Sequence, residues 1–65
     1  MFCVYRPGYT PGKSQPVDWY SAATTSRVME WQRTERGCEI VRSGFSSLDD
    51  AMAWLKAQGL KQQYG

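Results

Sequence analysis

A glycine-containing segment near the N-terminus has the residue types of a phosphate-binding loop. It runs Gly-Tyr-Thr-Pro-Gly-Lys-Ser from Gly8 to Ser14, after a stretch of strand-forming residues. A P-loop has four residues between its glycines and a helix directly after it, so that backbone N–H groups surround the phosphates. Here three residues separate Gly8 from Gly12, and Pro7 holds the position where the first glycine belongs. Pro16 also opposes a helix at this point. We therefore expect a connecting loop rather than a nucleotide site.

The carboxylates do not form a recognisable acid–base pair. The chain has no histidine, which removes Ser-His-Asp and Cys-His catalysis and the commonest general base at neutral pH. Paired catalytic carboxyls must converge in a cleft with their pKa values pushed apart, whereas adjacent helical residues such as Asp49 and Asp50 point in different directions. The other carboxylates are Asp18, Glu30, Glu35 and Glu39. We expect no enzymatic activity, no catalytic residue and no cofactor.

Two cysteines, Cys3 and Cys38, are the remaining reactive side chains. They cannot complete a structural zinc site, which takes four Cys or His ligands, so we expect no metal. The first interpretation of each is a small buried hydrophobic residue. The alternative is a disulfide between them, which would stabilise the fold by constraining the unfolded chain.

Aromatic side chains are the one excess in the composition, with three Trp and four Tyr among 65 residues. Trp, Tyr and Arg dominate the energetics of protein interfaces, so exposed members of this set predict a binding patch. The alternative is ordinary amphipathic packing for the aromatics, as we expect for Trp31, and solvated charge for the arginines. The candidate partner-binding residues are Trp19, Tyr20, Trp54, Tyr5, Tyr9, Arg6, Arg27, Arg33 and Arg42.

Length and charge limit the classes of protein to which this chain can belong. A chain of 65 residues forms one domain with a thin core and has little room for a buried catalytic cleft. We expect that domain over residues 1–60, followed by a frayed tail at 61–65. No apolar run is long enough for a membrane span or a signal peptide, so we expect a cytoplasmic protein with no membrane contact. A pI of about 8.7 permits nucleic-acid binding without requiring it.

The N-terminal half predicts strands separated by a long loop. Residues 2–6 are β-branched and aromatic, which is typical of a strand. Three prolines and two glycines fall within residues 7–16, a density that neither a helix nor a central strand tolerates. Residues 17–24 are interpreted as a second strand.

Residues 27–33 and 38–43 are interpreted as a β-hairpin whose turn ends at Gly37. The preferred register pairs Trp31 with Ile40 and segregates apolar from charged side chains. It leaves Val28 and Val41 unexplained. The core face of this hairpin would carry Met29, Trp31, Cys38 and Ile40.

Residues 47–58 form the clearest predicted helix. Ser46 or Ser47 can cap its first N–H groups, and the acids of its first turn favour the positive end of the helix dipole. Gly59 can end the helix in a left-handed conformation, with Leu60 folding back on Leu55. The expected buried stripe is Leu48, Ala51, Met52 and Leu55. Together these elements predict an α+β fold, a small antiparallel sheet of three to four strands with one C-terminal helix packed on one face.

The run from Arg42 to Leu55 resembles the end of the arm-binding N-terminal domain of tyrosine-type phage integrases. That family ends its third strand with Phe, turns with Ser or Thr, and opens a helix containing Ala-x-x-Trp-Leu, as Phe45 and the residues after it do here. The resemblance covers residues 27–57 and implies a sheet that lies in the DNA major groove. The preferred hairpin register places Glu30 and Glu39 on that surface, where carboxylates would oppose phosphate contacts.

Three functions follow in order of preference. The first is a small non-catalytic interaction protein that docks on a protein partner, as a phage-type inhibitor or regulator does. The alternative is a DNA-binding module similar to the integrase domains. The third is an oligomer-forming structural subunit.

Overall fold

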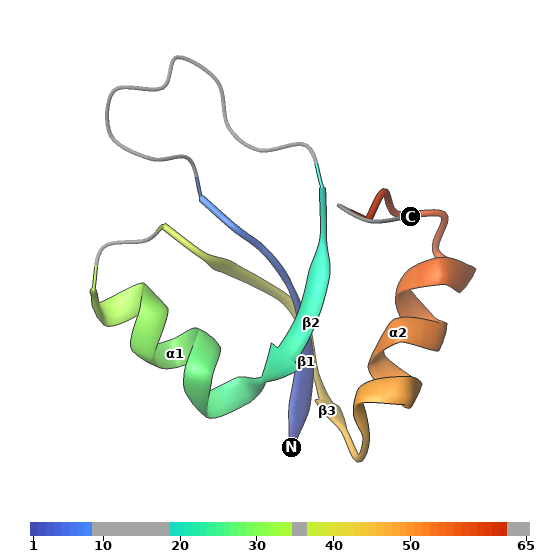
Figure 1. The fold of residues 1–65 in the computed structure, drawn as a ribbon, viewed down its shortest axis with the longest axis horizontal. Coiled ribbons are helices and arrows are strands. Elements are labelled where there is room, and N and C mark those ends of the chain that lie inside the picture. The colour runs from blue at the N-terminus through green and yellow to red at the C-terminus, as the bar shows by residue number, and fades with distance from the viewer. Residues whose placement is uncertain (9–18, 35–36, 63–65) are drawn as a thin grey trace.

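Three strands and two helices make up the described part of the chain. The structure, a computed structural model, describes residues 1–8, 19–34 and 37–62. The elements are β1 (Phe2–Arg6), β2 (Ser21–Thr24), α1 (Thr25–Arg33), β3 (Glu39–Phe45) and α2 (Leu48–Ala57). The sheet is antiparallel with the order β2-β1-β3. Its helices lie on opposite sides of it (Figure 1). The predicted α+β class and three-stranded antiparallel sheet are confirmed, but the sheet carries two helices instead of one.

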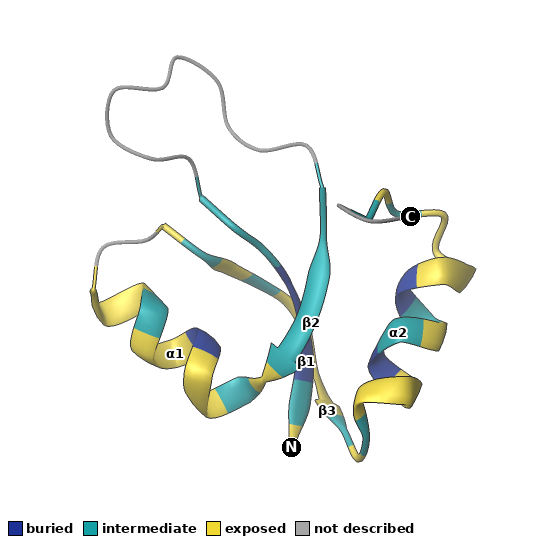
Figure 2. Cartoon of the chain, viewed as in Figure 1, coloured by how far each residue is buried: buried dark blue, intermediate teal, exposed yellow. Residues whose placement is uncertain are grey.

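β1 is buried on both of its faces, and its alternating side chains divide the core in two. Cys3 and Tyr5 pack with Val28 of α1. Val4, between them in the strand, packs with Ala51 and Leu55 of α2. Figure 2 shows the buried positions concentrated on β1 and on the sheet-facing sides of the helices. Because successive side chains of a strand point to opposite faces, this apolar strand needs a cover on each side.

The predicted hairpin is wrong, because residues 25–33 form the helix α1. Val28 and Trp31 are three residues apart, a spacing that places them together on a helix and on opposite faces of a strand. Val28 is completely buried, and the Trp31 ring lies 5.5 Å from the ring of Tyr5. Trp31 therefore packs on the sheet face opposite α2, and Ile40 belongs to a strand that pairs with β1.

α1 connects two strands that run in the same direction on either side of β1. Both β2 and β3 are antiparallel to β1, so they are parallel to each other, and parallel strands need a crossover connection. The arrangement is a split β-α-β unit with β1 inserted between its strands. A hairpin turn joins only antiparallel strands, so a helix stands where the hairpin was expected.

α2 agrees with its prediction in type and in position. It begins after Ser47, whose hydroxyl oxygen accepts a hydrogen bond from the Asp50 backbone N–H at 3.1 Å. It is followed by Gly59, which adopts a φ of 70°. The backbone N–H of Leu60 then donates to the carbonyl of Leu55 at 3.3 Å, and the Leu60 side chain packs on the α2 side of the core. This is the left-handed ending that the sequence predicts.

β3 contains two bulges, which set the direction of its side chains. Ile40 pairs with Tyr5 and Arg42 pairs with Val4, so Val41 is an extra residue. Gly44 is a second extra residue, between the partners of Cys3 and Phe2, and its φ of 94° is a conformation that suits glycine. Each bulge shifts the alternation by one position. Arg42 and Phe45 consequently both face α2.

Several predictions fall wholly or partly outside the described residues. The Gly12-Lys13-Ser14 segment and Tyr9 lie there, as do residues 17 and 18 of the predicted second strand and residues 63–65 of the predicted tail. Lys61 and Gln62, at the start of that tail, lie beside the residue before β2. The Tyr20 N–H donates to the Lys61 carbonyl at 2.7 Å, and Tyr20 forms a parallel bridge with Gln62.

Leu55 and Leu48 give a matched pair for testing the core. Leu55 is completely buried, whereas Leu48 of the same helix is 45% exposed. We expect Leu55→Ala to lose about 2–5 kcal/mol, comparable with the whole stability of a domain this small, about 3–5 kcal/mol. Leu48→Ala should change stability by about 0.5 kcal/mol or less. Urea unfolding followed by circular dichroism measures both, and similar losses for the two variants would contradict this placement of α2.

Candidate functional site

The predicted site residues do not form one surface. Tyr5 is a core residue beneath α1, with 9% of its surface exposed. Arg27 and Arg33 are exposed on α1. Trp19 is half-buried just before β2, and Tyr9 lies outside the described residues. The predicted residues that face α2 or belong to it are Arg6, Tyr20, Arg42 and Trp54.

Arg42 and Trp54 meet at the junction of β3 and α2. The Arg42 guanidinium carbon lies 5.6 Å from the centroid of the Trp54 ring, within the range of a cation–π contact. The same indole lies 5.9 Å from the ring of Phe45 at a tilt of 48°. Trp54 is half-buried and Arg42 is exposed. Phe45 therefore supports the indole from the core side while the arginine remains open to solvent.

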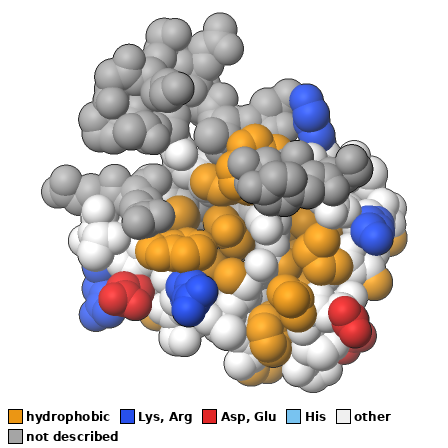
Figure 3. All heavy atoms as spheres, viewed as in Figure 1, with side chains coloured by type: hydrophobic (Ala, Val, Ile, Leu, Met, Phe, Trp, Pro, Cys, Tyr) orange, Lys and Arg blue, Asp and Glu red, His pale blue; other side chains and the backbone are white. Residues whose placement is uncertain are grey.

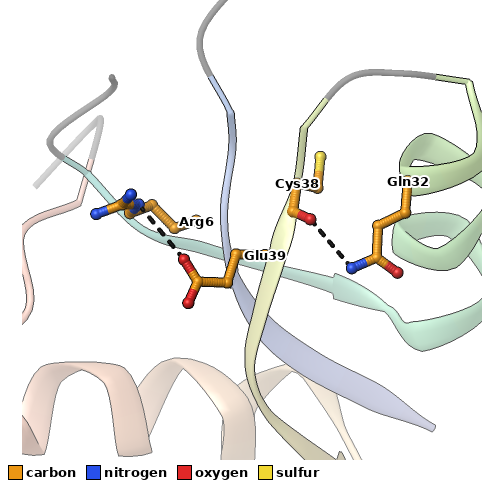
Figure 4. Close-up of polar contacts among 4 residues, drawn as sticks. All are labelled: Arg6, Gln32, Cys38 and Glu39. Carbon is orange, nitrogen blue, oxygen red and sulfur yellow. Dashed lines mark hydrogen bonds and ion pairs between the residues drawn. The ribbon is translucent and has the colours of Figure 1, made fainter. Parts of the chain in front are cut away.

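A second arginine lies on the same face of the sheet. The Arg6 Nε atom lies 3.9 Å from a carboxylate oxygen of Glu39, its partner across β1 and β3 (Figure 4). Their side chains are 39% and 68% exposed, so this ion pair stabilises the fold by about 1 kcal/mol at most. A partner could therefore compete for either group. We call Arg6, Glu39, Arg42, Phe45 and Trp54 the α2/β3 surface.

The α2/β3 surface has groups suited to recognition. Two arginines against one glutamate give it a positive balance. An arginine over the face of an indole can keep its N–H donors available for a carboxylate or a phosphate. Within residues 1–8, 19–34 and 37–62, no three His, Cys, Asp or Glu side chains lie close enough together to hold a metal ion.

The predicted site residues include neither Glu39 nor Phe45 of this surface, and of these two Phe45 is the one that contacts the Trp54 ring. Its signal was present, because a Phe at the end of a strand, nine residues before Trp54, is part of the pattern that carries the integrase resemblance. The direction of the Phe45 side chain could not be inferred without knowing of the bulge at Gly44, because one extra residue moves every later side chain to the other face of the sheet.

The two cysteines are both free, so the disulfide alternative is wrong for this structure. Cys3 pairs with Ser43 across the sheet, whereas Cys38 precedes the opposite end of β3. The Cys38 carbonyl instead accepts a hydrogen bond from the Gln32 side-chain amide at 3.0 Å, which ties α1 to β3 (Figure 4). Burial raises the pKa of the Cys3 thiol, and the side chain of Thr25 opposes this shift by a smaller amount. Burial likewise raises the pKa of Tyr5.

Comparisons with known proteins found no relative of this chain. No protein-family model matches it, and neither a curated protein nor a solved structure does so. Neither of the two described helices combines the length and the apolar character needed to cross a bilayer.

The cysteine environments predict selective alkylation. Cys3 is completely buried and its pKa is raised, so at neutral pH it holds less of the reactive thiolate and excludes the reagent. Cys38 is only partly buried. We expect iodoacetamide to label Cys38 first in the native protein and both residues in urea, as read by peptide mass spectrometry. Equal native labelling rates would contradict the burial of β1.

Proposed function

We propose that this chain is a non-catalytic binding module that docks on a protein partner through the α2/β3 surface and acts as an inhibitor or regulator of that partner. The observation that carries the proposal is the Arg42–Trp54 cation–π contact, with Phe45 packed against the same indole. Trp and Arg are the residue types whose truncation costs most in protein interfaces. A contact that exists before the partner arrives also reduces the side-chain entropy lost on binding.

The docking mode follows from the shape of β3. A strand added to the free edge of a sheet needs a regular row of N–H and C=O groups. The bulges at Val41 and Gly44 interrupt that row, a device by which natural edge strands resist unwanted pairing. Binding at this end of the molecule therefore uses side chains, with Arg42 and Trp54 at the centre.

The partner surface is expected to be acidic. The Arg42 guanidinium lies over the Trp54 ring, and Arg6 adds a second cation in an exposed ion pair with Glu39. A carboxylate of the partner can bind Arg42 in a bidentate manner while apolar atoms cover Trp54. Complementary charge of this kind raises the association rate as well as setting specificity.

Nucleic acid remains the second candidate, because arginine and tryptophan also contact phosphates and stack on bases. The integrase resemblance implies a bare sheet face in the major groove, and here each face of the sheet carries a helix (Figure 1). Nucleic acid would have to approach the α2/β3 surface, where Glu39 would face its phosphates. This arrangement favours the protein partner.

Two exposed arginines give a matched test. We expect immobilised wild-type protein to capture one partner protein from source lysate, and Arg42→Glu to retain more than about tenfold less of it. Arg33→Glu, the same change on α1, should capture as much as wild type. Circular dichroism checks that both variants keep the fold, which exposure of both residues predicts.

Nuclease treatment and salt separate the two candidates. Protein docking predicts that nuclease leaves capture unchanged and that a duplex oligonucleotide shows no anisotropy change at about 50 mM salt, where nucleic-acid binding is strong. Capture lost on nuclease treatment, with duplex affinity falling steeply at higher salt, would replace protein docking with nucleic-acid binding. Equal capture by wild type and Arg42→Glu would refute docking through the α2/β3 surface.

A further inference from the structure

The two edges of the sheet are built differently. β3 carries two bulges, and its exposed residues include Glu39 and Arg42. β2 pairs with β1 in an unbroken register from Ser21 to Thr24, and its sequence is Ser-Ala-Ala-Thr. Natural proteins protect a free edge with charge, proline or bulges. β3 has such protection, whereas β2 is regular, uncharged and built of small side chains that leave the backbone accessible.

Apolar side chains line β2 on both sides. Ala23 is only partly buried against the α1 side of the core, and Ala22 is only partly buried against the α2 side. In the space-filling view, hydrophobic side chains gather in two stripes, one between β2 and each helix (Figure 3). Both halves of the core are therefore incompletely covered at this edge, and a further strand there would extend their cover.

Residues 61 and 62 show that the outer side of this sheet edge accepts a further extended segment. The Tyr20 N–H already donates to the Lys61 carbonyl at 2.7 Å, and Tyr20 forms a parallel bridge with Gln62. Beyond this bridge, the described residues contain no strand paired with the outer side of Ser21–Thr24. Among the residues that the structure describes, the four residues of β2 therefore have an outer side with no paired strand.

We propose that two copies of this chain associate through β2, pairing their Ser21–Thr24 edges antiparallel about a two-fold axis perpendicular to the sheet. Such an axis places each residue opposite a partner residue on the same face of the sheet. Ala23 then lies at the centre, because centring on Ala22 would put Thr24 opposite Tyr20, whose outer edge Lys61 and Gln62 occupy. Small uncharged side chains let two identical strands approach, and no like charges meet at the edge although each chain carries a net +2. The two sheets become one continuous sheet, and the apolar stripes of the two copies adjoin.

Thr24 offers a substitution that blocks pairing and leaves the fold intact. It is exposed, and its side chain makes no capping hydrogen bond to α1. Lysine at an edge strand is a natural block to further pairing. The matched control is Ser43→Lys, on the exposed surface of β3. Light scattering or analytical ultracentrifugation over a concentration series gives the mass of each variant.

The wild type and Ser43→Lys should reach twice the monomer mass of 7.4 kDa as concentration rises, and Thr24→Lys should remain a monomer. Hydrogen exchange of the wild type supplies a test that needs no variant. Its outward-pointing amides in Ser21–Thr24 should exchange faster on dilution, while those of β3 should not change. A wild type that stays monomeric at about 1 mM, where even weak association is populated, would overturn the proposal. So would a Thr24→Lys dimer, or exchange at β2 that is independent of concentration.

Discussion

The burial of β1 on both faces is the constraint on which the rest of this structure depends. Cys3, Val4 and Tyr5 are three consecutive residues, and all are buried. Consecutive strand residues point to opposite faces, so one covering layer cannot bury all three. A chain of 65 residues meets this requirement by placing β1 at the centre of the sheet and packing one helix on each face.

The position of every other element follows from that choice. β2 and β3 become the two edges, and because they run parallel to each other, the segment between them must cross over one face of the sheet. α1 makes that crossing and α2 covers the other face. Two thin cores result, instead of one deep core. Trp54 beside β3 and Ala22 and Ala23 in β2 are among the side chains that these cores leave partly exposed, and they contribute to the two proposed contacts.

α2 was predicted correctly from the sequence because the features that indicate this helix are local. A serine cap, acids in the first turn, an apolar stripe and a final glycine all lie within one segment, and the structure uses each of them except the contact expected of the exposed Leu48. α1 offers no such signals. Its Thr24 cap makes no side-chain hydrogen bond, its first turn has no acid, and Val28 is its one completely buried residue. Alternating polar and apolar residues then favour a strand.

The predicted hairpin left two residues unexplained, and these residues indicated that the prediction was wrong. Val28 is completely buried on α1, and Val41 is the extra residue of a β3 bulge. The candidate site was predictable only in part for the same reason. The exposure of Arg42 and the partial burial of Trp54 follow from residue type and helix geometry. Their meeting with Phe45 depends on a pairing between β1 and β3 that brings together residues about 40 positions apart, and on two bulges that no local rule locates.

Nuclear Overhauser contacts between side chains test the central claim most directly. Burial of β1 between two helices predicts contacts from Val4 methyl protons to Leu55 and Ala51, and from the Tyr5 ring to Trp31 and Val28. It predicts none between Trp31 and either Leu55 or Met52, because the sheet separates them. Strong contacts from the Trp31 ring to the α2 side chains would place both on one face and contradict the two-sided burial of β1.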